Sequence, residues 1–168
     1  NCKIESLPES IGNLIKLKLL NLNINNLKSL SSVIGQLKSL EDLKLDGGEL
    51  FSDSEMGNEI TSIPPEIGQL KNLKRFTISE NKLSSIPSEI GKLLNLETLD
   101  LRKNNISILP DELSELKKLK LFNGKYGWKS TYQDEFTADN PFSSIPGDIF
   151  NLSWAKKLTS ISLSNCNV

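Results

Sequence analysis

The sequence predicts an α/β solenoid, with a parallel β-sheet along its concave side and short helices or 3-10 turns along its convex side. Three observations lead to this fold class. A Leu/Ile-Pro dipeptide recurs along the chain, the same apolar pattern follows each copy, and successive copies lie 23 residues apart or at a lengthened spacing. A fixed period of this kind indicates one structural unit that is repeated and stacked on itself.

About six repeats cover the chain. The spacings between their starting points are 23, 33, 23, 23 and 36 residues, and the second copy lacks the proline. Because the repeats tile all 168 residues, we expect a single domain, 1–168, whose two ends both fall inside a repeat. The copies begin at Leu7, Leu30, Ile63, Ile86, Leu109 and Ile145.

Each repeat predicts a strand followed by a returning turn. In the segment L-x-x-L-x-L, inward residues such as Leu99 and Leu101 alternate with outward positions, which is the pattern of a short strand. One strand cannot close a core, so we expect six of them to stack side by side as a parallel sheet. The run that begins at Pro110 predicts a short helical segment, because a proline and two acids favour the start of a helix. Leu113 and Leu116 form one apolar stripe on this segment, and we expect the stripe to pack against the other face of the sheet.

An asparagine follows the strand in several repeats. We expect Asn25, Asn81, Asn104 and Asn140 to turn into the core and to satisfy backbone groups that the bend removes from water. Gly48 takes this place in the second repeat, and we expect it to interrupt the ladder there.

The most complete copy runs from Leu83 to Ile106 and contains L-x-x-L-x-L-x-x-N-x-L, the leucine-rich-repeat signature. With L-P-x-E-I-G-x-L ahead of the strand, the pattern resembles the leptospiral leucine-rich-repeat proteins, and it is also similar to the Ras-pathway scaffold group of animals and plants. This resemblance implies a right-handed, curved solenoid of horseshoe form that binds other macromolecules.

Composition limits the classes of partner. The 20 Lys and Arg residues against 21 Asp and Glu residues give a net charge of −1, so we expect no broad attraction to nucleic acid. No apolar run approaches the roughly 18 residues of a membrane-spanning helix, so we expect no membrane insertion. The chain opens inside a repeat and without a methionine, and we expect the natural protein to extend upstream.

The two cysteines fall in the asparagine slot of the first and last repeats. At about 4.8 Å per strand, Cys2 and Cys166 would lie about 29 Å apart, which is too far for a disulfide. We therefore expect reduced cysteines that are buried in the ladder.

Catalysis finds no support in the sequence. The chain has no histidine, no metal-ligand cluster, no phosphate-binding glycine loop and no nucleophile beside a base, so we predict neither an enzyme nor a cofactor. The acids Asp53, Glu55 and Glu59 lack the order of an EF-hand calcium loop.

The outward strand positions are the first candidate for partner binding. The Leu and Asn positions of each repeat pack inside the fold. The outward strand positions stack in columns on the concave face and carry charges of both signs, a pattern that suits selective protein recognition. The alternative is a solvated face whose charges pair with their neighbours. The candidates are Asp42, Lys44, Arg75, Asp100 and Arg102.

Two insertions, near 47–59 and 124–140, are the second candidate. Both leave the scaffold after a strand, so we expect them to emerge from one edge of the solenoid, three strand spacings or about 14 Å apart. The second contains Tyr126, Trp128 and Tyr132, residue types that are enriched at binding hot spots, and we predict them as anchors of a clamp. In the alternative, Trp128 and Phe136 fold back over the apolar edge of the solenoid.

Three functions remain open. The first is a secreted or surface-exposed bacterial protein that binds a host protein, such as a cell-surface adhesion receptor. This expectation rests on the leptospiral resemblance and, more loosely, on similarity to the internalin adhesins. The second is a cytoplasmic signalling scaffold. The third is the substrate-recognition domain of an effector enzyme whose catalytic domain lies outside this sequence. We also expect self-association through the uncapped ends.

Overall fold

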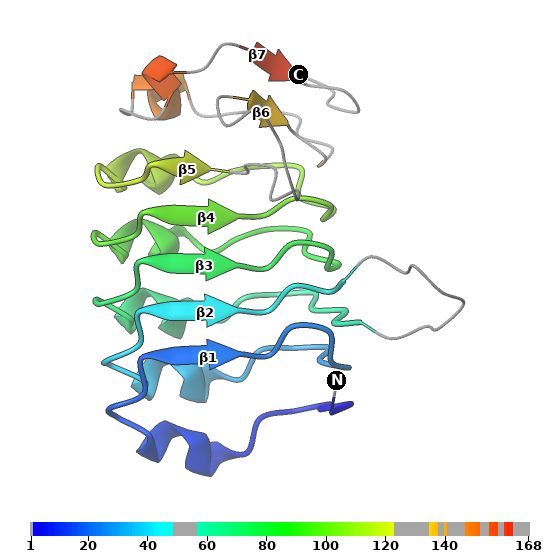
Figure 1. The fold of residues 1–168 in the computed structure, drawn as a ribbon. Helices are drawn as coiled ribbons and strands as arrows, with labels where there is room; N and C mark the ends of the chain where they lie inside the picture. The colour runs from blue at the N-terminus through cyan, green and yellow to red at the C-terminus, as the bar shows by residue number, and fades with distance from the viewer. Residues whose placement is uncertain are drawn as a thin grey trace.

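The computed structural model describes residues 2–48, 57–122, 135–137, 140, 147–151, 155–157 and 160–162. In this part of the chain, strands and 3-10 turns alternate and stack (Figure 1). The strands are β1 (Leu19–Asn21), β2 (Asp42–Lys44), β3 (Arg75–Thr77), β4 (Thr98–Asp100), β5 (Leu121–Phe122), β6 (Glu135–Thr137) and β7 (Ser160–Ser162). The turns are η1 (Glu9–Asn13), η2 (Ser32–Gln36), η3 (Pro65–Gln69), η4 (Ser88–Lys92), η5 (Asp111–Glu115), η6 (Gly147–Asn151) and η7 (Ala155–Lys157).

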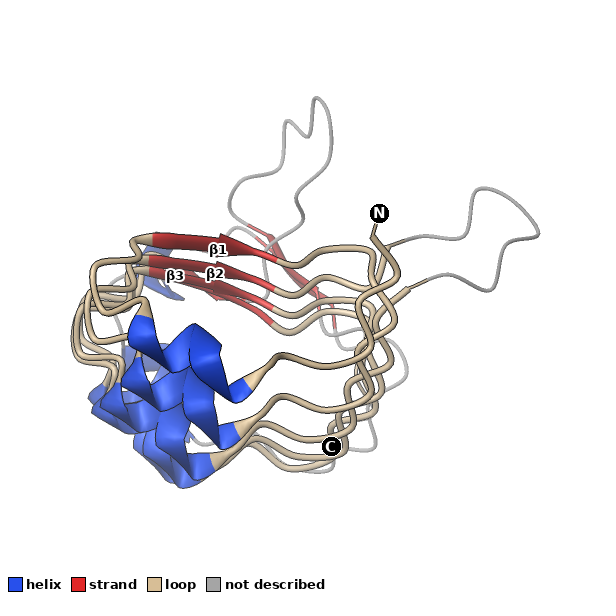
Figure 2. Ribbon diagram, turned by 90° about the horizontal axis from the view of Figure 1, so that it is seen from below, coloured by secondary structure: helices blue, strands red, loops and turns tan. Residues whose placement is uncertain are grey.

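Strands β1 to β5 form one parallel sheet in chain order. The 3-10 turns lie on the opposite side of the molecule (Figure 2). The register places equivalent repeat positions side by side, so that Leu43 is opposite Phe76 and Phe76 is opposite Leu99. This arrangement confirms the predicted fold class.

The covering segments are 3-10 turns because only five residues lie between the extended residue before each turn and the leucine that ends it. In η4, Pro87 is extended at φ −71° and ψ 148°, and the Leu93 N–H donates to the Ile90 carbonyl at 3.0 Å. A glycine in this turn lets neighbouring repeats approach, since a Cβ on Gly91 would lie 2.5 Å from the Glu112 carbonyl oxygen.

The core is a stack of aliphatic layers between the sheet and the turns. Each internal repeat contributes strand and turn residues that are fully buried, as Ile90, Leu93, Leu96 and Leu99 show in the fourth. Among the described residues, Phe76 is the largest fully buried side chain, and it takes a leucine position in β3. Close packing of this kind makes the inward positions intolerant of change in volume.

The asparagine ladder is continuous through the second repeat, so the predicted interruption at Gly48 is wrong. Asn58, at the end of the first insertion, supplies the missing member and is 3% exposed. Its Nδ2 donates to the carbonyls of Leu22 and Leu45 at 2.8 and 3.1 Å, and its Oδ1 accepts the Leu27 N–H at 3.1 Å. The bend has the same unpaired backbone groups whatever the length of the insertion, so an asparagine is needed where the chain returns.

The C-terminal part differs from the expected stack of six strands. Strand β6 lies within the second insertion, and it pairs in parallel with β7 to form a separate two-stranded sheet. Its sequence, Glu135-Phe136-Thr137, alternates as a strand does but is too short to give a period. The repeat pattern therefore located β7 and missed its partner.

Cys2 is exposed, contrary to the expectation of burial, because no layer of the described chain lies beneath the first repeat. Its N–H donates to Asn25 Oδ1 at 3.3 Å, and the ladder bond of this repeat comes from the Ile4 N–H to the same oxygen at 3.1 Å. Cys166 lies outside the described residues. Among the helices of the described ranges, none is long and apolar enough to span a membrane.

Candidate functional site on the concave sheet

The structure brings the five predicted strand residues onto one surface in the predicted columns. Asp42 pairs with Arg75 in the register of β2 and β3, and Thr77 pairs with Asp100 in that of β3 and β4. Lys44 ends β2, and Arg102 follows β4 by two residues. The surface is therefore shared by at least three consecutive repeats.

Asp42 and Arg75 form an ion pair across two repeats. The Arg75 Nη1 donates to Asp42 Oδ2 at 2.6 Å, and the Lys44 ammonium is 4.0 Å from the same oxygen. Asp42 is 8% exposed, and its Oδ1 is buried without a hydrogen-bond partner in the described structure. The Arg75 side chain remains 48% exposed, so it presents its guanidinium to solvent on the concave face.

Asp100 and Arg102 form a second pair within one repeat. Arg102 donates from Nε to Asp100 Oδ1 at 2.9 Å and from Nη2 to Oδ2 at 2.6 Å, which is bidentate geometry. Asp100 is 2% exposed. Charge-assisted bidentate pairs fix the plane of the guanidinium, so Arg102 is held rather than extended into solvent.

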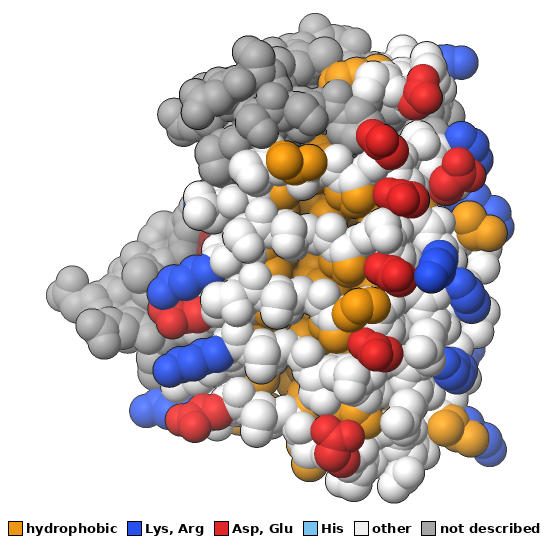
Figure 3. All heavy atoms as spheres, turned by 180° about the vertical axis from the view of Figure 1, so that it is seen from behind, with side chains coloured by type: hydrophobic (Ala, Val, Ile, Leu, Met, Phe, Trp, Pro, Cys, Tyr) orange, Lys and Arg blue, Asp and Glu red, His pale blue; other side chains and the backbone are white. Residues whose placement is uncertain are grey.

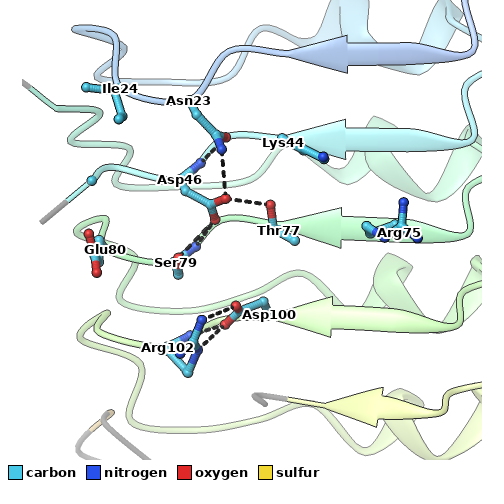
Figure 4. A pocket seen from close by; sticks show the side chains of 11 residues that line it. Asn23, Ile24, Lys44, Asp46, Arg75, Thr77, Ser79, Glu80, Asp100 and Arg102 are labelled. Atoms are coloured by element: carbon cyan, nitrogen blue, oxygen red, sulfur yellow. Dashed lines mark hydrogen bonds and ion pairs between the residues drawn. The ribbon is translucent and has the colours of Figure 1, made fainter. Parts of the chain in front are cut away.

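Asp46 joins three repeats through a network that the repeat pattern did not single out (Figure 4). Its Oδ2 accepts from Asn23 Nδ2 at 3.1 Å and from the Thr77 hydroxyl at 2.8 Å. Its Oδ1 accepts from the backbone N–H and the hydroxyl of Ser79, both at 2.9 Å. Four donors satisfy this carboxylate, which makes the floor of the concave face rigid.

Most of these groups, though not Asp42, line a hollow of about 770 Å³ on the concave face. This volume lies in the range of ligand-binding clefts in proteins. Ile24 lines the hollow as well and was missed by sequence reasoning, although an apolar residue in a slot that holds Glu80 and Lys103 in later repeats was a usable signal. The other lining residues are Asn23, Lys44, Asp46, Gly48, Arg75, Thr77, Ser79, Glu80, Asp100 and Arg102.

The points of departure of the two insertions lie on the same edge of the sheet, as expected. The first leaves after β2 at Gly48, the second leaves after β5, and the sheet order places three strand spacings between β2 and β5. The chain that departs into the first insertion is pinned, because a Cβ on Gly47 would overlap the carbonyl oxygen of Glu80. Tyr126, Trp128 and Tyr132 lie outside the described residues, so their role as anchors stays a prediction.

A row of alternating positive and negative side chains crosses the repeats just before the strands begin. Glu41 lies between Lys18 and Lys74, at 3.1 and 2.7 Å, and Lys120 meets Glu97 at 2.8 Å in the same column. Hydrogen bonds from Lys74 and Lys18 lower the pKa of Glu41, and the hydrogen bond from Lys120 lowers the pKa of Glu97. The bond to Glu41 raises the pKa of Lys74.

These shifts predict a pH dependence of stability. A carboxylate with a lowered pKa stabilises the fold above its ordinary value and loses this contribution as the pH falls through its folded-state value. The urea midpoint should therefore fall as the pH drops below about 4.5, the ordinary value for Glu41 and Glu97. The Glu41→Gln/Glu97→Gln variant should show a smaller fall over the same range. Because this row is exposed, 1 M salt should also reduce the difference between the two proteins, and an identical pH profile would contradict the assignment.

The convex face carries charge of both signs as well. Acidic side chains lie over the 3-10 turns, and basic side chains lie along both edges (Figure 3). A hollow of about 540 Å³ between η3 and η4 is lined mainly by exposed long side chains, including Lys38, Lys71 and Lys92. Charge alone therefore does not distinguish the two faces. Both carry bonds between repeats, but those of the convex hollow, such as Lys38 to Gln69, are exposed, whereas Thr77, Ser79 and Asp100 on the concave face are buried. Within the described ranges, no group of three or more acidic or cysteine side chains could hold a metal ion.

Comparisons with known proteins identify the repeat. The leucine-rich-repeat family model matches residues 72–123. No curated protein matches the sequence. A leucine-rich-repeat protein of Leptospira interrogans is 28% identical, with a TM-score of 0.60, over 98% of this chain and 41% of that one. A plant peptide hormone receptor, RGFR1 in complex with RGF2, is 32% identical, with a TM-score of 0.69, over 95% of this chain and 26% of that one.

An internalin C2 from Listeria monocytogenes shares the fold at 22% identity and a TM-score of 0.62, over 97% of this chain and 55% of that one. The chain thus spans between about a quarter and about half of the length of these three proteins. Its parallel sheet and 3-10 turns agree with the leucine-rich-repeat fold of these neighbours. The chain is a leucine-rich-repeat protein that resembles the leptospiral leucine-rich-repeat proteins.

Proposed function

We propose that the chain is the recognition surface of a secreted or surface-exposed bacterial protein, and that it binds a host protein, such as a cell-surface adhesion receptor, through its concave face and insertions. The leucine-rich-repeat fold is that of a protein–protein interaction module. The observation that carries the concave assignment is the hollow, whose polar lining is fixed by bonds that cross repeats, such as those from Asn23, Thr77 and Ser79 to Asp46.

Preorganised polar groups favour selective binding, because little side-chain entropy is lost when a partner arrives. Charged groups at fixed positions also exclude partners with mismatched charge. The plant receptor that is 32% identical is described in complex with a peptide hormone, which supports a protein or peptide partner here. Likeness to the Leptospira interrogans protein supports a bacterial source.

Binding to arrayed proteins tests this function. The purified chain is applied to an array of animal cell-surface ectodomains and, in parallel, to an array of Ras-family GTPases and cytosolic phosphatases. We expect a saturable ectodomain complex whose affinity falls when residues 125–139, with Tyr126, Trp128 and Tyr132, are replaced by a short Gly/Ser linker. Binding confined to the cytosolic array would contradict the proposal and favour the signalling scaffold.

We also propose self-association through the first repeat. Its apolar layer is covered less than the layers above it: Leu14 is 50% exposed, whereas Leu93, in the same position of the fourth repeat, is fully buried. Light scattering over a hundredfold range of concentration should show the mean mass rising. Leu14→Glu should reduce this rise, and a constant monomer mass at every concentration would refute it.

A further inference from the structure

Ile24 is a large apolar side chain that is exposed in a disfavoured backbone conformation. Its φ is +53° and it is 44% exposed. This left-handed region is costly for L-residues and most unusual for a β-branched one. Glu80 and Lys103 hold the same slot at φ +57° and +51°, but their charged side chains pair with each other at 3.1 Å. The fold therefore requires the conformation and does not require an isoleucine. One side of Ile24 packs against Gly48, where a Cβ would lie 2.8 Å from its Cγ1, and the exposed part of the side chain is open to a contact outside the fold.

The carboxylates that line the hollow already have partners. Asp46 accepts four hydrogen bonds, Asp100 holds Arg102, and Glu80 holds Lys103. A cationic side chain of a partner would have to share these carboxylates with the donors and cations that already hold them. The hollow is thus poorly suited to a basic ligand.

Lys44 is engaged less fully, because its ion pair with Asp42 is long. Its ammonium lies 4.0 Å from Asp42 Oδ2, beyond hydrogen-bond distance, and that oxygen already accepts from Arg75 at 2.6 Å. Its side chain is 33% exposed and lines the hollow. The hollow therefore offers donors to an incoming anion, and an acidic side chain is its complement.

We infer that the hollow binds an extended segment of the partner in which an Asp or Glu contacts Lys44 and an aliphatic side chain packs on Ile24. This inference rests on the proposed function and names the chemistry of its partner. The Ile24 N–H donates to the Asp46 carbonyl at 2.9 Å, so Ile24 lies beside the residue two places beyond Lys44. Two residues of extended chain span about 7 Å, which is also the repeat of side chains on one face of a bound peptide. The segment is therefore acidic-x-aliphatic, or the reverse.

A peptide library tests this inference. A phage-displayed library of random 12-residue peptides is selected on the purified chain, and the enriched peptides are synthesised and titrated. We expect enrichment of Asp or Glu two residues from Leu, Ile or Val. Lys44→Gln and Ile24→Asn should each weaken binding about tenfold or more, whereas Ile24→Leu, which keeps the apolar surface, should bind as the parent does.

Stability separates a contact role for Ile24 from a structural one. Asparagine adopts the left-handed region more readily, so Ile24→Asn should unfold at an equal or higher urea concentration while it binds more weakly. A lower midpoint together with weaker binding would assign the residue to the fold and overturn the inference.

Thr98→Arg places a large side chain on the concave face beside the hollow. Peptide and ectodomain binding by this variant distinguish failure of the inference from failure of the proposed function. Peptides that are lost with Thr98→Arg but unaffected by Lys44→Gln and Ile24→Asn would overturn only the acidic-aliphatic assignment. Enrichment of basic peptides, or of none, would overturn it as well. Ectodomain binding that tolerates Thr98→Arg would instead contradict the concave function.

Discussion

Replacing Leu99 with alanine is expected to lower the free energy of unfolding by about 2–5 kcal/mol. Leu99 is fully buried in β4 and lies beside Phe76 in the register of the sheet. The substitution removes buried methyl groups and leaves a cavity between layers that are fixed by the strands on either side. Urea denaturation followed by circular dichroism measures the loss.

The matched control is the neighbouring residue. Thr98 is the first residue of β4, it faces outward, and its side chain is only partly buried. Thr98→Ala should change the free energy of unfolding by no more than about 0.5 kcal/mol. Equal losses in the two variants would reject the assignment of inward and outward positions on which the concave site depends.

Replacing Asn81 with aspartate is expected to cost at least about 3 kcal/mol at neutral pH, although the two side chains have the same shape. Asn81 is 8% exposed, and its Nδ2 donates to the carbonyls of Leu45, Ile78 and Ser79 at 2.9, 3.2 and 2.9 Å. A carboxylate would place negative charge against three carbonyl oxygens. It would keep only the bond that Asn81 Oδ1 accepts from the Ile60 N–H at 2.9 Å.

Two further variants isolate the cause. Asn81→Ala leaves the Ile60 N–H unpaired, whereas each of the three carbonyls keeps another donor, so its cost should be smaller, about 1–3 kcal/mol. Asn105→Ala, at an exposed position beside the ladder, should be neutral. Lower pH should relieve part of the aspartate penalty, since a protonated carboxyl can donate one hydrogen bond. An aspartate variant as stable as the parent at pH 7 would refute the ladder geometry.

The scaffold was predictable because its residues repeat. Leucine at fixed intervals gave the inward positions, the sheet order and the columns that contain Asp42 and Arg75. The ladder was predictable only where the period held: Asn58 lies after an insertion, and nothing local distinguishes it from other asparagines. Strand β6 was missed for a similar reason, because three residues of alternation carry no measurable period.

The site was less predictable because it depends on pairing between repeats. The sequence placed Asp100 and Arg102 in the concave columns but did not show that they bind each other, or that Asp46 is held by four donors. The positive φ at Ile24 could not be predicted from the residue type, because isoleucine disfavours this conformation. These features follow from the stacking of one repeat on the next, and a single repeat does not contain them.

The most direct measurement of the concave assignment compares one substitution on the two faces of the fourth repeat. Thr98 lies on the concave strand β4 and Ser88 on the convex turn η4, and both are hydroxyl residues with solvent exposure. Each is replaced by arginine, and the dissociation constant is measured for the first ectodomain found to bind. We predict that Thr98→Arg weakens binding at least tenfold and that Ser88→Arg leaves it within twofold of the parent. The reverse order would contradict binding through the concave face.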